Sequence, residues 1–147
     1  MRVEHEVVIE RPPEVVYDYL ADPGNLRNWQ EGLLEVRRAE EGPAAVGDRW
    51  VEIRTAMGRR LEAAVELTEA EPGSRFTVVS VAGPVRFRVE HLLQPVEGGT
   101  RIAVVGEGEA GGVMKLAGGM VARQLRAGFQ ASFARLKRIL EAGDGAG

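Results

Sequence analysis

The sequence predicts an α+β fold, and three observations support this prediction. Residues 3–29 contain one segment that alternates apolar and polar residues, followed by two short helical segments. Residues 33–109 are divided by regularly spaced glycine and proline turns into further segments of period two. After Gly112 the apolar residues recur every three or four positions, as in a helix with one apolar face. The 147 residues, 44% of them apolar, fit a single domain at 1–143 and a short flexible tail at 144–147.

The N-terminal part predicts one half-buried strand and two short helices. In residues 3–9 the side chains of Val3, His5, Val7 and Ile9 fall on one face, and those of Glu4 and Glu6 fall on the other. Pro13 suits the first position of a helix, so the first helix is expected to begin there. Asp22 can cap a second short helix that carries Trp29.

The central and C-terminal parts predict a sheet and a long helix that covers it. Residues 33–109 are expected to form about six antiparallel strands joined by short hairpins, most clearly at 60–67 and 85–90. A continuous helix at 112–142 would be about 45 Å long. It would end at Gly143, a suitable C-cap residue. The sheet has one apolar face, and this helix is expected to cover it.

Glycines interrupt both the last strand and the helix. Residues 106–111 read G-E-G-E-A-G, but the glutamates would repel a pyrophosphate and no second parallel strand follows, so we reject a dinucleotide site. These glycines are expected to bend the strand and turn it into the helix. Gly118 and Gly119 fit either a kink or contact with the sheet, or room for a ligand. Gly128 is expected to mark close packing.

Composition excludes several functional classes. The chain has no cysteine, which excludes disulfides, thiolate metal sites and a cysteine nucleophile. A net charge of −3 argues against a nucleic-acid partner, and no apolar stretch is long enough for stable membrane insertion. The N-terminus lacks the pattern of a secretory signal. We therefore expect a cytoplasmic protein with no metal and no cofactor.

The order of several short motifs resembles the START-like superfamily, also called Bet v 1-like or SRPBCC. Within it, the chain is most similar to the bacterial polyketide cyclase/dehydrase and lipid-transport family. The resemblance covers nearly the whole chain and rests on Ile9 to Pro13 with Val16-Tyr17, Asp22-Pro23 with Asn25 to Trp29, Val46-Gly47-Asp48, Gly98 to Arg101, and Leu136 to Arg138 with Glu141. It implies a helix-grip fold: a curved seven-stranded antiparallel sheet wrapped around the C-terminal helix, with two short helices between strands 1 and 2 and an apolar cavity inside.

Both histidines are expected on the apolar face of the sheet. His91 shares the parity of Phe87, and His5 lies on the apolar face of the first strand. In the resembled strand order, the strand with Val104 lies between them, which separates the two by about 9.5 Å. No inward acidic residue or metal-binding motif is recognised nearby, so ordinary buried histidines with local hydrogen bonds are the favoured interpretation. Ligand contact or catalysis by His91 and His5 is the alternative.

The leading functional hypothesis is binding or transport of a hydrophobic or amphipathic small molecule, such as a lipid, isoprenoid, quinone or polyketide-like compound. The candidate lining residues are Ile53, Val65, Leu67, Phe87, Val89, His91, Val104, Met120, Gln124, Leu125 and Phe129. The alternatives are an enzyme of the cyclase or dehydratase type in the same cavity, and an adaptor acting through its surface. A protein partner or a homodimer is left open. Many glycines and few aromatic residues fit a curved sheet with a partly hollow interior, although a compact Val/Ala/Leu core has the same composition.

Overall fold

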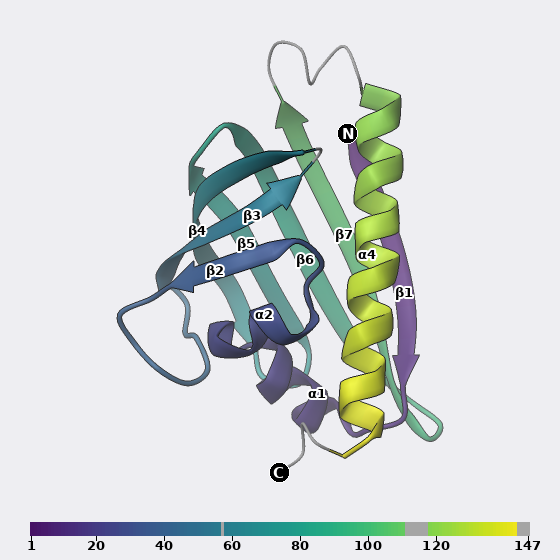
Figure 1. Cartoon of the computed structure of the whole chain (residues 1–147). Coiled ribbons are helices and arrows are strands. Elements are labelled where there is room, and N and C mark those ends of the chain that lie inside the picture. The colour runs from purple at the N-terminus through teal and green to yellow at the C-terminus, as the bar shows by residue number, and fades with distance from the viewer. Residues whose placement is uncertain (57, 111–117, 144–147) are drawn as a thin grey trace.

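A computed structural model describes residues 1–56, 58–110 and 118–143 (Figure 1). Seven strands of this part form one antiparallel sheet in the order β1-β7-β6-β5-β4-β3-β2. The strands are β1 (Arg2–Ile9), β2 (Leu33–Arg37), β3 (Arg49–Ala56), β4 (Arg59–Glu71), β5 (Arg75–Ala82), β6 (Val85–Val96) and β7 (Gly99–Ala110). The helical elements are α1 (Pro13–Leu20), η1 (Pro23–Asn25), α2 (Leu26–Trp29) and α4 (Gly118–Glu141). The predicted seven-stranded helix-grip arrangement is confirmed.

Local signals in the sequence place the short helices as predicted. Pro13 is the first residue of α1. The Asp22 carboxylate accepts a 2.8 Å hydrogen bond from the Gly24 amide, but it caps the 3₁₀ turn η1 rather than α2 directly. Tight turns join the later strands: Gly73 and Gly98, at the β4–β5 and β6–β7 hairpins, have φ values of 77° and 80°, which residues with a side chain rarely adopt.

The long helix is described from Gly118 to Glu141, and residues 112–117 of its predicted span lie outside the described residues, as does the tail at 144–147. Gly143 has a φ of 86°, and its amide donates to the Leu140 carbonyl, which confirms the predicted end of the helix. The expectation of close packing at Gly128 is wrong. A methyl group at Gly128 would meet no atom within 4 Å, because this side of the helix faces open space.

The hydrophobic core is closed at one end of the molecule. Near α1 and α2, the sheet and the C-terminal half of α4 bury Phe133, Leu136 and Leu140. Between residues 119 and 131 of α4, by contrast, only Val121 is fully buried. Figure 1 shows α4 running alongside β1, which is its main contact in the sheet. The N-terminal half of α4 therefore leaves much of the adjoining sheet face uncovered.

Hydrogen bonds fasten the C-terminal end of α4 to the chain around β1. Lys137 donates to the Val8 carbonyl at 2.6 Å. The side chain of Arg11 donates to the Leu140 carbonyl at 2.9 Å, and the Glu10 amide donates to the Glu141 carboxylate at 2.9 Å. These contacts use the carbonyls and charges that a helix presents at its C-terminus. They fix one end of the helix against the sheet.

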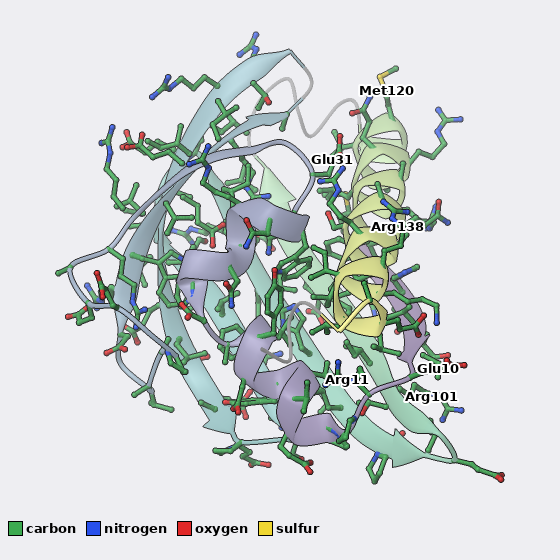
Figure 2. All side chains as sticks on the ribbon, turned by 60° about the horizontal axis from the view of Figure 1, so that its bottom comes forward. Glu10, Arg11, Glu31, Arg101, Met120 and Arg138 are labelled. Atoms are coloured by element: carbon green, nitrogen blue, oxygen red, sulfur yellow. The ribbon has the colours of Figure 1, made fainter. Side chains whose placement is uncertain are left out.

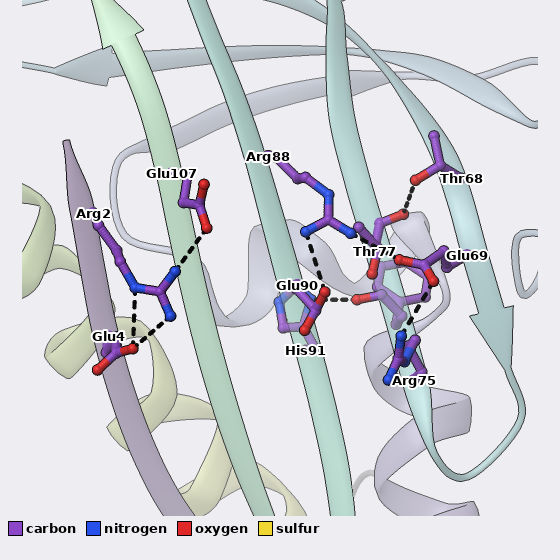
Figure 3. Close-up of polar contacts among 11 residues, drawn as sticks. Arg2, Glu4, Thr68, Glu69, Arg75, Thr77, Arg88, Glu90, His91 and Glu107 are labelled. Carbon is purple, nitrogen blue, oxygen red and sulfur yellow. Dashed lines mark hydrogen bonds and ion pairs between the residues drawn. The ribbon is translucent and has the colours of Figure 1, made fainter.

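Charged side chains cover the face of the sheet opposite α4. Figure 3 shows Arg88 of β6 between Glu90 and Glu69, at 3.1 Å and 2.9 Å, and Arg75 of β5 paired with Glu69 at 3.2 Å. Each such partly exposed pair stabilises the fold by about 1 kcal/mol at most. Their position identifies this as the outer face, and the opposite, inner face as the one toward α4.

Candidate ligand-binding site

The two histidines and their neighbours form one row across the inner face. His5 pairs with Val104 in the β1–β7 ladder, and Val104 pairs with His91 in the β7–β6 ladder. His91 in turn pairs with Phe76 of β5. Directly paired residues of antiparallel strands point to the same face. The predicted placement of both histidines on the apolar face, with the Val104 strand between them, is therefore confirmed.

Phe133 of α4 contacts both histidine rings. Its ring centroid lies 5.7 Å from that of His5 and 6.0 Å from that of His91, and the Trp29 ring packs on it at 5.1 Å. We call His5, Trp29, Phe76, His91, Phe129 and Phe133 the aromatic cluster. In the described residues, no three His, Asp or Glu side chains come together in an arrangement that could hold a metal ion. An apolar ring, rather than a charged group, thus joins the two histidines.

His91 is held as a neutral hydrogen-bond donor through one ring nitrogen. Its Nδ1 lies 2.9 Å from the Phe76 carbonyl oxygen, and because a carbonyl only accepts, we assign the proton to Nδ1 (Figure 3). Nε2 then carries a lone pair. Burial lowers the pKa of His91 to about 4, which outweighs the raising effects of the Phe76 carbonyl, Glu90 and Glu52. Burial also lowers the pKa of His5.

Beyond the aromatic cluster, the inner face is only partly covered. The side chains of Leu61, Ala63, Phe87 and Val89 are half-buried, although all share the face that carries α4. Phe129 of α4, a member of the aromatic cluster, is also half-buried and connects that cluster to this part of the inner face. We call Leu61, Ala63, Phe87, Val89 and Phe129 the open apolar surface. These side chains lie on the inner face and keep part of their surface exposed.

The structure separates the predicted lining residues into distinct groups. Val65, Leu67 and Val104 are at most 1% exposed and belong to the closed core beneath the open apolar surface. His91 lies between that core and the open apolar surface, to which Phe87, Val89 and Phe129 belong. Leu125 is 42% exposed on the N-terminal half of α4.

Three predicted lining residues lie elsewhere. Trp50 pairs with Val65 and Ile53 pairs with Glu62, so Ile53 faces the side of the sheet opposite Val65. On that outer face, Arg37 of β2 and Glu62 of β4 form an ion pair of 3.4 Å across β3, beside Ile53. The Ile53 side chain is only 1% exposed. On α4, Gln124 is exposed, and Met120 is 53% exposed and projects outward at the N-terminal end of the helix (Figure 2).

A buried carboxylate on the inner face was not expected from the sequence. Glu52 is 6% exposed and shares the inner face with Trp50 and Arg54. Its carboxylate accepts hydrogen bonds from Trp50 Nε1 at 2.9 Å and from Arg54 Nη2. Arg54 Nη2 also donates to Gln30 Oε1 at 2.9 Å. We call Gln30, Trp50, Glu52 and Arg54 the polar cluster. The signal that could have found it is the shared parity of Trp50, Glu52 and Arg54.

The loop after α2 is fastened to α4 beside these residues. The Glu31 amide donates to Ser132 Oγ at 2.8 Å, and Arg135 pairs with the Glu31 carboxylate at 2.9 Å. Figure 2 shows Glu31 next to the helix. Just before this loop, Trp29 Nε1 is buried and makes no hydrogen bond within the described part of the chain. The loop closes the site on the side of α2.

A groove of about 710 Å³ lies at the β5–β6 hairpin, and although Phe87 is among its lining residues, Arg86, Arg88, Glu107 and Glu109 place it mainly on the outer face of the sheet. The β5–β6 ladder stops at the pair Val79–Arg88, although both strands continue further. Beyond it, the Phe87 amide donates to Ser80 Oγ at 2.9 Å instead of to a backbone carbonyl. The sheet is therefore loosened where it meets the open apolar surface.

Comparisons with known proteins identify relatives of the whole chain. The family model described as "Polyketide cyclase / dehydrase and lipid transport" matches residues 1–141. No functionally curated protein matches the chain. Among the described helices, none combines the length and hydropathy that crossing a membrane requires.

Solved structures share the fold at low sequence identity. TTHA0849 from Thermus thermophilus is 20% identical with a TM-score of 0.85, and the match covers 97% of this chain and 99% of that one. CV1439 from Chromobacterium violaceum is 23% identical with a TM-score of 0.76, over 96% and 98% of the two chains. Ara h 8.0201 is 14% identical with a TM-score of 0.68, over 97% and 98%.

Proposed function

Because the chain belongs to the polyketide cyclase/dehydrase and lipid-transport family of the START-like, Bet v 1-like superfamily, we propose that it binds a hydrophobic or amphipathic small molecule on the inner face of its sheet. The family commonly binds hydrophobic ligands. The observation that carries the proposal for this chain is the open apolar surface: half-buried side chains inside the fold, next to a core that is otherwise closed.

The driving force for such binding is removal of apolar area from water. Each 100 Å² of apolar surface removed from water contributes about 2.5 kcal/mol before the cost of immobilising the ligand. Phe87, Val89 and Phe129 supply this surface in our proposal. Val65, Leu67 and Val104 hold the underlying sheet rigid, since they are fully packed.

The state of His91 favours binding over acid–base catalysis. A general base works best when its pKa is near the operating pH. Burial lowers the pKa of His91 to about 4, so at neutral pH the ring is a weak base and no acid. Its Nε2 lone pair suits acceptance of a hydrogen bond from a ligand hydroxyl instead.

The proposal is tested by identifying bound molecules and by titrating a neutral apolar probe. Small molecules extracted from natively purified protein are analysed by mass spectrometry, with a refolded sample as the reference. In parallel, N-phenyl-1-naphthylamine is titrated against the wild type and two matched variants. Phe87→Ala is expected to weaken probe binding several-fold, because it removes part of the open apolar surface. Arg86→Ala, the outward neighbour, is expected to leave it unchanged.

The opposite results would overturn the proposal. If no extracted molecule is found reproducibly and the probe does not bind the folded wild type, the inner face is not a ligand site. Equal probe affinity in the Phe87→Ala and wild-type proteins would place the binding surface elsewhere. Circular dichroism on each variant establishes that the compared proteins are folded.

A further inference from the structure

The polar cluster borders the open apolar surface. In the β3–β4 ladder, Glu52 pairs with Ala63 and Arg54 pairs with Leu61. Both partners on β4 belong to the open apolar surface and are half-buried. A ligand lying on that surface therefore reaches the charged groups of β3 without leaving the inner face.

The polar cluster contains N–H groups that have no hydrogen-bond acceptor within the described residues. Both hydrogen bonds of Arg54, to Glu52 and to Gln30, use Nη2, so within the described residues Nη1 and Nε remain for another acceptor. The side chain of Arg54 is 32% exposed, whereas Glu52 is buried. Gln30 accepts through its oxygen, which leaves its amide nitrogen as a further donor. Each oxygen of Glu52 already accepts one hydrogen bond.

Two different residues donate hydrogen bonds to the Glu52 carboxylate, so Arg54 satisfies only one of its oxygens. The indole N–H of Trp50 donates to Oε2 of Glu52 at 2.9 Å, while Arg54 serves Oε1. The negative charge of Glu52 is thus shared between two donors. Both two-donor edges of a guanidinium include Nη2, which Glu52 and Gln30 already occupy, so Arg54 offers a further carboxylate a single charge-assisted hydrogen bond from Nη1 or from Nε.

We propose that Arg54 binds the carboxylate of an amphipathic ligand whose apolar part lies on the open apolar surface. This rests on the proposed function and adds the chemical class of the ligand. Leu61 and Ala63, the ladder partners of Arg54 and Glu52, are the nearest apolar contacts for such a ligand. Phe87 is level with Ser80, Val65 and Trp50, so it lies three strand intervals, about 14 Å, across the sheet and four residues, about 13 Å, along the strands from Arg54, and only a longer chain reaches it. Glu52 limits the affinity, because its charge repels the incoming carboxylate.

The test compares two probes that differ in one polar group. Decanoate and decanol each compete with the neutral fluorophore N-phenyl-1-naphthylamine at pH 7 and low salt. The wild type is expected to bind decanoate about tenfold more tightly than decanol, as one charge-assisted contact provides. Arg54→Gln is expected to remove this preference while decanol binding stays the same. Arg49→Gln, an arginine of β3 that pairs with Glu66 at the outer face, is the matched control and is expected to keep the preference.

A second variant keeps the test decisive if Arg54→Gln does not fold. Glu52→Gln removes the repelling charge, so it is expected to strengthen decanoate binding several-fold and leave decanol unchanged. Decanoate binding that is unchanged or weaker in Glu52→Gln overturns the inference. Equal wild-type affinity for decanoate and decanol also overturns it but leaves the proposed function standing. If decanoate, decanol and the fluorophore all fail to bind, the proposed function itself is wrong.

Discussion

Phe129 of α4 lies directly on Gly106 of β7. A methyl group at position 106 would come within 2.9 Å of Phe129 Cζ, so the absence of a side chain there lets the ring rest on the sheet. The sequence predicted that the glycines of this strand serve to bend it. At Gly106 the structure gives a different reason, which is contact with the half-open part of the helix.

Gly106→Ala is expected to displace the Phe129 ring and lower the free energy of unfolding by about 1 kcal/mol. The loss is modest because the ring is half-buried and belongs to the loosely packed half of α4. Urea denaturation measures it. In a Phe129→Ala background the same substitution is expected to cost almost nothing, so an undiminished loss there would contradict the proposed contact.

Gly128→Ala is expected to stabilise the protein by about 0.5–1 kcal/mol. Alanine favours the helix interior over glycine, and the added methyl group meets no atom within 4 Å. Gly99→Ala is the opposite case, because its methyl group would lie 2.2 Å from the Ile9 carbonyl oxygen. Thermal or urea denaturation of the two variants should give shifts of opposite sign, and shifts of the same sign would refute this reading of the two positions.

Stability is expected to fall as the pH decreases from about 6.5 to 4 because of His91. In this range the unfolded chain binds a proton at this position that the folded protein, with a His91 pKa of about 4, does not bind. Unfolding therefore takes up a proton, and the contribution of His91 to stability, about 3 kcal/mol, is present above this range and is lost below it.

The His91→Gln variant isolates this effect, since carboxylate titration affects both proteins alike. The difference in unfolding free energy between wild type and variant is measured by urea denaturation from pH 4 to pH 8. It should change with pH between 4 and 6.5 and be constant above 7. A difference that does not vary with pH would mean that His91 titrates normally in the folded protein.

The two tryptophans are expected to respond differently to replacement by phenylalanine. Trp50 Nε1 donates to the buried Glu52 carboxylate, whereas Trp29 Nε1 is buried without a partner in the described residues. Trp50→Phe therefore leaves a buried charge with one donor fewer, and it should cost about 2 kcal/mol more than Trp29→Phe. Urea denaturation at pH 7 measures both, and equal losses would show that the indole bond to Glu52 contributes nothing.

The sequence was sufficient to predict the order of elements and the inward face of most strands. On β6 and β1 the alternation is clear despite Val8 and Leu92, because most apolar residues and a histidine oppose charged ones, and the structure places His91 and His5 accordingly. The turns were predictable for a local reason, since glycine at positions such as Gly73 and Gly98 adopts a φ that other residues rarely do.

On β3 the alternation pointed to the wrong face. The apolar Val51 and Ile53 share one parity and the charged Glu52 and Arg54 share the other, so apolarity alone directs Ile53 inward. The structure reverses this, because Trp50 pairs with Val65 on the inner face, while on the outer face the Arg37–Glu62 ion pair crosses β3 beside Ile53. A buried Glu–Arg pair depends on partners from other segments, here Gln30, which no local pattern reveals.

The uneven attachment of α4 sets a gradient of local stability along a single helix. The cost of a local opening depends on the contacts that must be broken. Lifting the turns near Leu125 breaks few contacts, whereas detaching the end near Leu140 breaks the bonds to Val8 and Arg11 as well as core packing. Openings of a few turns at this end can therefore occur without global unfolding. Amide hydrogen exchange should become slower from one end of the helix to the other.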